Sequence, residues 1–193
     1  MMKKISCLCL IAVFIILSGC ESEYAGNVDQ VENQGNSEQY FTDPAIEILR
    51  SVPQLHVSIQ SEAQQRVMAI IGVSNWSFTD ADGVVHSGPL TDSPHSLQLS
   101  QADLSRVTLY LHYEINDIVL EFDAPPQSLS VTRWNAVYAD TQYIGDAVDE
   151  NVPVGLNGNT ISIIDDGYAY VYEIRAVWEQ GLAYYTFRTE SAR

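Results

Sequence analysis

The chain contains very little cysteine and lysine, and both absences narrow what the protein can be. Its three cysteines are Cys7, Cys9 and Cys20, so no cysteine occurs after Cys20. A domain formed by the later residues must fold without disulfide bonds and without thiolate metal ligands. The two lysines, Lys3 and Lys4, stand at the N-terminus, and the only later lysine or arginine cations are seven arginines.

This scarcity of positive charge leaves residues 20–193 strongly acidic. Seven arginines face 25 acidic residues, which gives this part of the chain a formal net charge of −18, against −16 for the whole chain. Such a surface is repelled by phosphate backbones and by anionic lipid headgroups. We therefore expect no nucleic-acid partner. The charge chiefly indicates an exposed, soluble surface, with an acidic binding face as the alternative.

The first twenty residues have the layout of a secretory signal peptide. Two lysines precede an apolar stretch from Leu8 to Leu17 that is too short to cross a membrane, since crossing needs about 20 apolar residues. The tetrad Leu17-Ser18-Gly19-Cys20 resembles the bacterial lipobox, which implies diacylglycerol transfer to the Cys20 sulfur and cleavage just before it. We expect residues 1–19 to be a lipoprotein signal peptide. Cys20 then anchors the chain to the extracytoplasmic face of the cell membrane.

Residues 20–42 are expected to form a flexible acidic stalk after the lipidated cysteine. They are rich in Glu, Asn, Gln, Ser and Gly and have no periodic apolar pattern, so they cannot bury enough surface to offset the entropy of ordering. A coil of this length spans about 25 Å on average. Residues 43–193 contain no second low-complexity break, and we expect them to form one domain.

Hydrophobic alternation with a period of two dominates this domain and indicates β-strands. A short helix precedes them, with Asp43 as its N-cap, Pro44 in its first turn and Pro53 beyond its end. The expected strands are residues 55–60, 66–73, 76–78, 84–85, 107–113, 118–122, 129–134, 160–164, 168–179 and 182–189. Short strands with turns at this spacing predict an all-β fold, specifically an antiparallel immunoglobulin-like β-sandwich with one short N-terminal helix.

Several details of this fold can also be predicted. The strand 66–73 is apolar on both faces, which is typical of a central strand. The strands 107–113 and 118–122 should form a hairpin, and so should 168–179 and 182–189. Ser100 followed by Asp103 predicts one capped helical turn, and residues 138–158 read as a long irregular loop. Trp134, Trp178 and the tyrosine row from Tyr168 to Tyr172 should contribute mainly to the core, with an aromatic platform as the alternative.

Several segments together resemble an uncharacterised extracytoplasmic β-domain of Gram-positive lipoproteins, also seen at the outer end of some membrane peptidases of the β-lactam-sensor type. The resemblance covers roughly residues 73–187. It rests on Asn75-Trp76-Ser77-Phe78, Thr91-Asp92-Ser93-Pro94-His95-Ser96-Leu97, Phe122-Asp123-Ala124-Pro125-Pro126-Gln127-Ser128, Val131-Thr132-Arg133-Trp134, Gly167-Tyr168-Ala169-Tyr170, Ala176-Val177-Trp178 and Tyr185-Thr186-Phe187. Ser96 replaces a second proline usual in the family. The resemblance implies a fold and a Gram-positive envelope location, and it brings no catalytic residues.

Four residues are candidates for binding: Asp80, Asp82, Asp92 and His95. Asp92-Ser93-Pro94-His95 holds the residue types of acyl-transfer chemistry, but the intervening proline makes a local triad awkward and favours a structural turn. Asp80, Asp82 and Gly83 begin like a calcium loop, yet the later ligand positions hold Val84 and Thr91, so a hairpin turn is preferred.

The sequence therefore predicts no catalytic residues, no cofactor and no metal site. A looser calcium site that adds Asp140, Asp146, Asp149 or Glu150 to the Asp80 segment is the alternative. The four histidines do not have zinc-ligand spacing.

A non-enzymatic surface module that binds or senses is the function that fits best. Its contacts would come from loops 79–83, 88–96 and 138–158. Its partner would be a membrane protein or a cell-wall fragment. A cell-envelope hydrolase and a scaffold for a membrane protein are the two alternatives, and they predict respectively a pocket with convergent acids or a Ser-His pair, and an exposed sheet edge.

Overall fold

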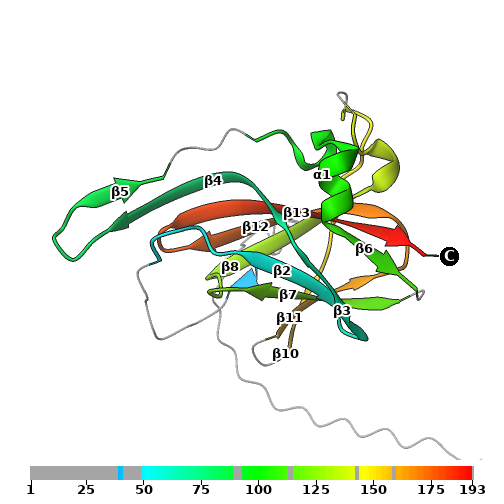
Figure 1. Cartoon of the computed structure of the whole chain (residues 1–193), viewed down its shortest axis with the longest axis horizontal. Helices are drawn as coiled ribbons and strands as arrows, with labels where there is room; N and C mark the ends of the chain where they lie inside the picture. Colours follow the sequence, from blue (N-terminus) through cyan, green and yellow to red (C-terminus); the bar gives the residue numbers. More distant parts are fainter. Residues whose placement is uncertain are drawn as a thin grey trace, which may run out of the picture. The chain divides into compact units, whose positions relative to one another are not determined.

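The computed structural model of the chain describes residues 39–40, 49–88, 93–112, 115–141, 144–157 and 160–192. The predicted signal peptide, Cys20, most of the stalk, the predicted helix start at Asp43 and the candidate residue Asp92 lie outside the described residues. Residues 49–54, just before the first long strand, are not helical. Residues 35–193 belong to one compact unit, and its two β-sheets confirm the predicted all-β class (Figure 1).

The smaller sheet is antiparallel throughout and has five strands. In spatial order they are β10 (Val154–Asn157), β11 (Thr160–Asp165), β7 (Asn116–Phe122), β2 (Leu55–Ile59) and β3 (Glu62–Met68). β2 shows the predicted alternation, because Leu55, Val57 and Ile59 are fully buried while His56 and Ser58 are half-buried. One face of this sheet thus points into the core.

The larger sheet has eight strands. Its main path runs β1 (Gln39–Tyr40), β8 (Ser128–Asn135), β12 (Tyr170–Trp178), β13 (Gly181–Ser191), β4 (Ile70–Thr79) and β5 (Val85–Ser87), while β6 (Thr108–Leu111) pairs with β13 and β9 (Glu150–Asn151) with β8. The predicted β12–β13 hairpin is confirmed. β1 falls within the predicted stalk and pairs with the start of β8.

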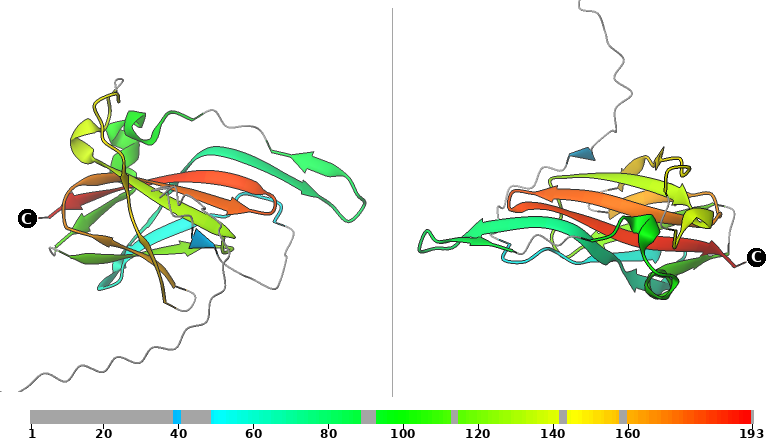
Figure 2. Two further views of the ribbon diagram at one scale, coloured as in Figure 1. Left: turned by 180° about the vertical axis from the view of Figure 1, so that it is seen from behind. Right: turned by 90° about the horizontal axis from the view of Figure 1, so that it is seen from above.

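The core lies between the two sheets, which are seen as separate layers in Figure 2. Trp178, the last residue of β12, belongs to this core, with its ring centroid 5.5 Å from that of Trp76 and 5.6 Å from that of Phe122, in edge-to-face geometry. Tyr185 is also fully buried there, and its hydroxyl donates to the Pro53 carbonyl at 2.7 Å. Edge-to-face aromatic packing of this kind adds to the stabilisation from buried area.

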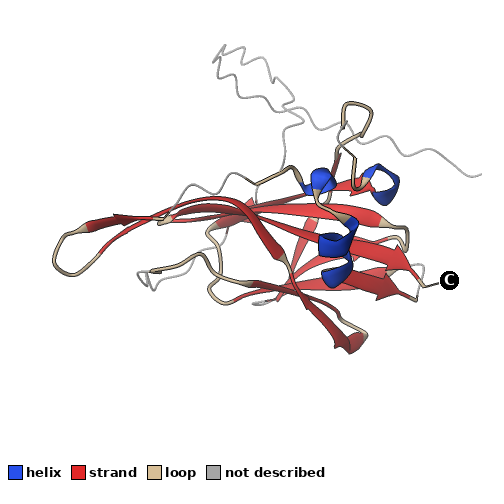
Figure 3. Cartoon of the chain, turned by 45° about the horizontal axis from the view of Figure 1, so that its top comes forward, coloured by secondary structure: helices blue, strands red, loops and turns tan. Residues whose placement is uncertain are grey.

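A second apolar cluster lies on the opposite face of the larger sheet. Three short helices gather there (Figure 3): η1 (Ser96–Gln98), α1 (Gln101–Arg106) and η2 (Ala136–Tyr138). They place Leu97, Leu104 and Ala136 against Trp134 and Val171 of the sheet. Trp134 therefore belongs to this outer cluster rather than to the inter-sheet core that the sequence predicted.

α1 confirms the predicted capped turn. The Ser100 hydroxyl oxygen accepts a hydrogen bond from the Asp103 amide, and the hydroxyl donates to the Asp103 carboxylate at 2.6 Å. Among the described helices, none is long and apolar enough to cross a membrane.

Three predictions of strand position were wrong. Residues 107–113 and 118–122 do not form a hairpin, because β6 pairs in parallel with β13 while β7 pairs with β2 and β11 in the other sheet. The segment 66–73 is not one central strand. The chain changes sheets near Ala69, so that edge strand β3 ends at Met68 and β4 begins at Ile70. The predicted long loop 138–158 ends in two strands, β9 and β10.

Candidate functional site

The turn between β4 and β5 has the geometry that its sequence predicts. The amide of Asp80 donates to the Val84 carbonyl and the amide of Gly83 donates to the Asp80 carbonyl, both at 3.0 Å. Gly83 has a φ of 79°, a left-handed conformation that glycine adopts without steric cost. Oδ1 of Asp80 also accepts from the amides of Asp82 at 3.0 Å and Val84 at 2.9 Å. The Asp80 carboxylate therefore fixes the turn from inside.

His86 joins this turn to the ribbon behind it. Its Nε2 lies 2.7 Å from Oδ2 of Asp80, and its ring stacks on Phe78 with centroids 4.8 Å apart. An isolated two-stranded ribbon is only marginally stable. The contact between Asp80 and His86, the stacking on Phe78 and the hydrogen bonds of the turn therefore help to fix the shape of this one.

The β4–β5 hairpin, residues 77–88, extends beyond the rest of the larger sheet (Figure 1). β4 pairs with β13 only as far as Trp76, which lies opposite Gly181, and residues 77–79 pair with β5 alone. All residues from Ala81 to Gly88 are exposed, with Val84 53% and Val85 67% exposed. The hairpin thus presents apolar and acidic side chains to its surroundings on a preorganised frame.

Acidification is expected to loosen this turn. The hydrogen bond with His86, followed by that from the Val84 amide, holds the pKa of Asp80 below its ordinary value of 3.8. Because the folded pKa is lowered, the carboxylate stabilises the turn fully above pH 3.8 and loses this effect as the pH falls through the lower folded value. Protection of the Asp82 and Val84 amides against hydrogen exchange, corrected for intrinsic rates, should fall in that range.

The matched control is Asp80→Asn, which keeps an acceptor oxygen for the two amides but carries no charge. Its protection should be lower than that of the wild type at pH 7 and constant across the same acidic range. Equal pH profiles for the two proteins would contradict the assigned role of the Asp80 charge.

The three candidate binding residues that the structure describes, Asp80, Asp82 and His95, do not converge on one site. Asp80 and Asp82 belong to the hairpin, whereas His95 packs edge-on against Trp134, with centroids 4.9 Å apart, beneath the short helices. Nδ1 of His95 accepts from the Leu97 amide at 3.2 Å and caps η1. His95 therefore has the backbone-capping geometry of the structural-turn alternative.

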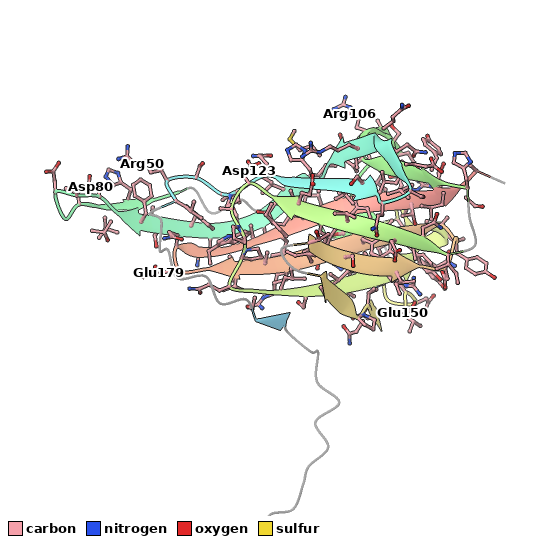
Figure 4. The ribbon with its side chains drawn as sticks, turned by 90° about the horizontal axis from the view of Figure 1, so that it is seen from below. Arg50, Asp80, Arg106, Asp123, Glu150 and Glu179 are labelled. Carbon is pink, nitrogen blue, oxygen red and sulfur yellow. The ribbon has the colours of Figure 1, made fainter. Side chains whose placement is uncertain are left out.

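The looser calcium site is contradicted by the positions of its proposed ligands. Figure 4 shows Asp80 and Glu150 at opposite ends of the sheets. Asp149 accepts from the Trp134 indole N–H at 2.7 Å, and Glu150 binds Arg133. In the described part of the chain, no group of three or more histidine, cysteine or acidic residues is arranged to hold a metal ion.

A polar network that the sequence analysis missed lies at the end of the sandwich away from the hairpin. Arg133 on β8 donates from Nε and Nη2 to the two carboxylate oxygens of Glu150 at 2.9 and 2.8 Å, and its guanidinium lies 4.0 Å from the Tyr170 ring centroid. Burial lowers the pKa of Arg133, but hydrogen bonds to Glu150 and Tyr172 outweigh burial and raise that pKa above its ordinary value. Arg133 stays charged and links β9 to β8.

Asp165 forms the buried centre of this network. Its carboxylate is completely buried and accepts from the Tyr172 hydroxyl at 2.6 Å, the Gly167 amide at 2.6 Å and the Thr189 hydroxyl at 3.2 Å. Burial raises the pKa of Asp165, and these hydrogen bonds oppose that rise in part. The network connects β11, β12 and β13 and is closed to solvent at its centre, which is typical of a structural role.

One sequence signal could have revealed this network. Arg133 follows Leu129 and Val131 in the inward-facing row of β8, and a charged residue in such a row must find a charged or hydrogen-bonding partner. Its partners Glu150 and Asp166 lie in the two-residue strand β9 and in a turn, and no local period reveals them.

A cavity of about 340 Å³ lies beside the turn after β2, lined by Gln60, Ser61, Ile115, Asn116 and Asp117. This described lining supplies one carboxylate and no histidine. The envelope-hydrolase hypothesis requires two convergent acids or a Ser-His pair, and the described lining residues of this cavity provide neither.

The chain was compared with known protein families, with characterised proteins and with solved structures. None of the three comparisons finds a match.

Proposed function

We propose that this chain is a lipid-anchored, non-enzymatic binding module on the extracytoplasmic face of a bacterial membrane, built on an immunoglobulin-like sandwich, and that it contacts its partner through the β4–β5 hairpin. The projecting hairpin is the observation that carries the proposal. In the described residues, it combines exposure of every residue from Ala81 to Gly88 with a conformation fixed by internal hydrogen bonds of Asp80.

The loop after η2 is a weaker candidate for contact with a partner. Asp149 and Glu150 bind the neighbouring β8 residues Trp134 and Arg133, and β9 pairs with the same strand. A loop whose acidic groups are already engaged has fewer groups to offer a partner, since binding would first have to break those contacts. In the hairpin, Asp80 and His86 are bonded to each other, and both residues belong to the hairpin itself. Binding of a partner to the hairpin therefore need not break this contact.

The lipid anchor is supported by the lipobox-like tetrad ending at Cys20. With β1 beginning at Gln39, residues 21–38 separate the anchor from the first strand. If these residues form the coil that the sequence predicts, they span about 23 Å on average. The domain would then be held close to the membrane, within reach of an embedded protein or wall material.

The test compares two exposed valines in the full chain, crosslinked in native membranes. Val84→Asp alters the hairpin, while Val137→Asp makes the same change on η2, where Val137 is 78% exposed. We expect Val84→Asp to reduce the yield of a specific crosslinked product at least tenfold, whereas Val137→Asp leaves it unchanged. Equal yields from both variants would exclude the hairpin as the contact, and failure of Cys20→Ser to release the chain from membranes would exclude the anchor.

A further inference from the structure

The hydrogen bonds of the β4–β5 hairpin define which main-chain groups face outward. Hydrogen-bonded and non-hydrogen-bonded pairs alternate along an antiparallel ladder. Asp80 and Val84 form a bonded pair, and so do Trp76 and Gly88, whose amide donates to the Trp76 carbonyl at 2.8 Å. The pair midway between them must be bonded as well.

That middle pair is Phe78 and His86. The N–H and C=O groups of Val85 and Ser87 consequently point away from β4. By the same alternation, Ser77 on β4 belongs to a non-hydrogen-bonded pair with Ser87, so its amide points away from β5. It donates to the Gln180 carbonyl at 2.8 Å. This observed bond supports the assignment of the outward groups on β5.

The outward edge of β5 is open. Among the described strands, β5 pairs only with β4 and ends the path of the larger sheet. Natural edge strands are protected by short length, lysine, proline, inward charges or bulges. β5 is short, with three residues, but residues 85–87, Val-His-Ser, contain no lysine or proline, and their pairing with β4 has no register shift. The outward groups of Val85 and Ser87 have the spacing that an added strand would match.

We propose that an extended segment of a partner protein adds to β5 as a further strand, bonds to the main-chain groups of Val85 and Ser87, and carries a basic residue near Asp82. This inference rests on the hairpin contact proposed above and specifies its chemistry. The side chain of Val85 is 67% exposed on one face of the ribbon. We expect the residue of the added strand that lies opposite Val85 on this face to be apolar.

Charge determines which kind of segment fits. The tip carries Asp80 and Asp82, and the whole chain has a net charge of −16, so a basic segment is attracted to it. A second copy of the chain is the less suitable occupant, because the two copies repel each other.

The experiment measures amide hydrogen exchange at single residues in the full chain, once in native membranes and once purified in detergent. Strand addition should slow exchange of the Val85 and Ser87 amides at least tenfold in membranes, because these amides become donors to the partner. The amide of His86, already bonded to β4, should change far less. Equal exchange of Val85 and Ser87 in the two samples overturns the proposal.

Two variants separate main-chain bonding from side-chain contact. Ser87→Pro removes the outward N–H, and proline is tolerated on an edge strand where that N–H faces away from the sheet. Ser87→Ala removes only the hydroxyl. We expect Ser87→Pro to lose the crosslinked product and Ser87→Ala to keep it, with the exchange of the Val84 amide reporting that the turn is intact in both.

Three other outcomes have definite meanings. If Val84→Asp abolishes crosslinking while Ser87→Pro does not, the hairpin contact stands and strand addition is wrong. If the Val85 and Ser87 amides become protected in the purified chain as its concentration rises, the occupant is a second copy and the partner proposed here is wrong. If Asp82→Lys leaves the crosslink yield unchanged, the basic residue is wrong.

Discussion

Gly181→Ala is expected to destabilise the domain by about 3–4 kcal/mol, close to the upper end of single-residue effects. Gly181 begins β13 with a φ of 148°, a conformation that residues with a Cβ rarely adopt. A Cβ at this position would lie 1.9 Å from the carbonyl oxygen of Asn75 and 2.9 Å from its carbonyl carbon. Both atoms are backbone, so relief requires separation of β13 from β4.

The matched control is Gly83→Ala. Gly83 also has a positive φ, 79°, but a Cβ there meets nothing within 4 Å. It should cost only the backbone strain of a left-handed residue, about 1 kcal/mol. Guanidinium chloride unfolding of both variants at pH 7 measures the difference. A loss below about 1.5 kcal/mol for Gly181→Ala would show that β4 and β13 can separate there at little cost.

The position of Gly181 also matters for the hairpin. Gly181 lies opposite Trp76, the last β4 residue paired with β13 before the ribbon continues alone. A shift of β13 at this point changes the direction of the hairpin. Reduced crosslinking of Gly181→Ala under native conditions would therefore follow from the same cause and does not locate a contact at Gly181.

The strands that could be predicted from sequence are those with local signals. β2 and β12 show two-residue alternation in the sequence, and the Asp82-Gly83 and Gln180-Gly181 dipeptides mark the turns of two hairpins. The positions of these strands follow from side-chain period and turn chemistry. These signals lie in residues that are close together in the chain, so they can be recognised without knowledge of the tertiary fold.

Pairing between distant segments could not be predicted in this way. β6 alternates as a strand should, yet its partner is β13, whose Arg188 lies opposite Thr108 in a parallel register. The sequence around β6 and β7 suggests a hairpin because the two strands are close in the chain. The apolar segment 66–73 misleads in a similar manner, since one run of apolar residues serves two strands in different sheets.

The candidate site was predicted in part. Asp80 and Asp82 lie on the exposed hairpin, but His86, which bonds to Asp80, was not singled out because its partner is six residues away across the turn. Which main-chain groups of β5 point outward follows from the alternation of hydrogen-bonded and non-hydrogen-bonded pairs in the hairpin. That alternation is known only once the two strands are paired. The expectation of a lipid anchor at Cys20 concerns a part of the chain outside the described residues, and it stays a prediction.

The second large effect is expected for Asp165→Ala, with a loss of about 3 kcal/mol in the free energy of unfolding. The substitution removes the acceptor of the Tyr172 hydroxyl and of the Gly167 amide. The Thr189 hydroxyl also contacts Asp165 but keeps a second acceptor, the Tyr168 carbonyl at 3.1 Å. Tyr172 is completely buried, so water cannot replace its lost acceptor without opening the sheet. Each unsatisfied buried donor costs on the order of 1–3 kcal/mol, so two such donors account for a loss of about 3 kcal/mol.

Asp165→Asn separates the loss of hydrogen bonds from the loss of charge. The asparagine carbonyl oxygen can accept from Gly167, and its NH₂ can donate to the Thr189 hydroxyl oxygen, whose proton turns to the Tyr168 carbonyl, so that only the Tyr172 hydroxyl loses its acceptor. The neutral side chain also avoids the cost of burying a carboxylate. We expect a change within about 1 kcal/mol of the wild type at pH 7. A loss as large as that of Asp165→Ala would mean that the negative charge itself is required.

The pH dependence gives a second, independent test of the buried carboxylate. Burial raises the folded-state pKa of Asp165 above its ordinary value of 3.8, so the folded protein holds this proton at pH values where the unfolded chain has released it. The contribution of Asp165 to stability is therefore greatest below pH 3.8 and falls as the pH rises through the folded value. The difference in unfolding free energy between the wild type and Asp165→Asn should shift in favour of the wild type on acidification from pH 7 toward pH 4. The opposite shift would place the folded pKa below 3.8, and hydrogen bonding rather than burial would then control the ionisation of this carboxyl.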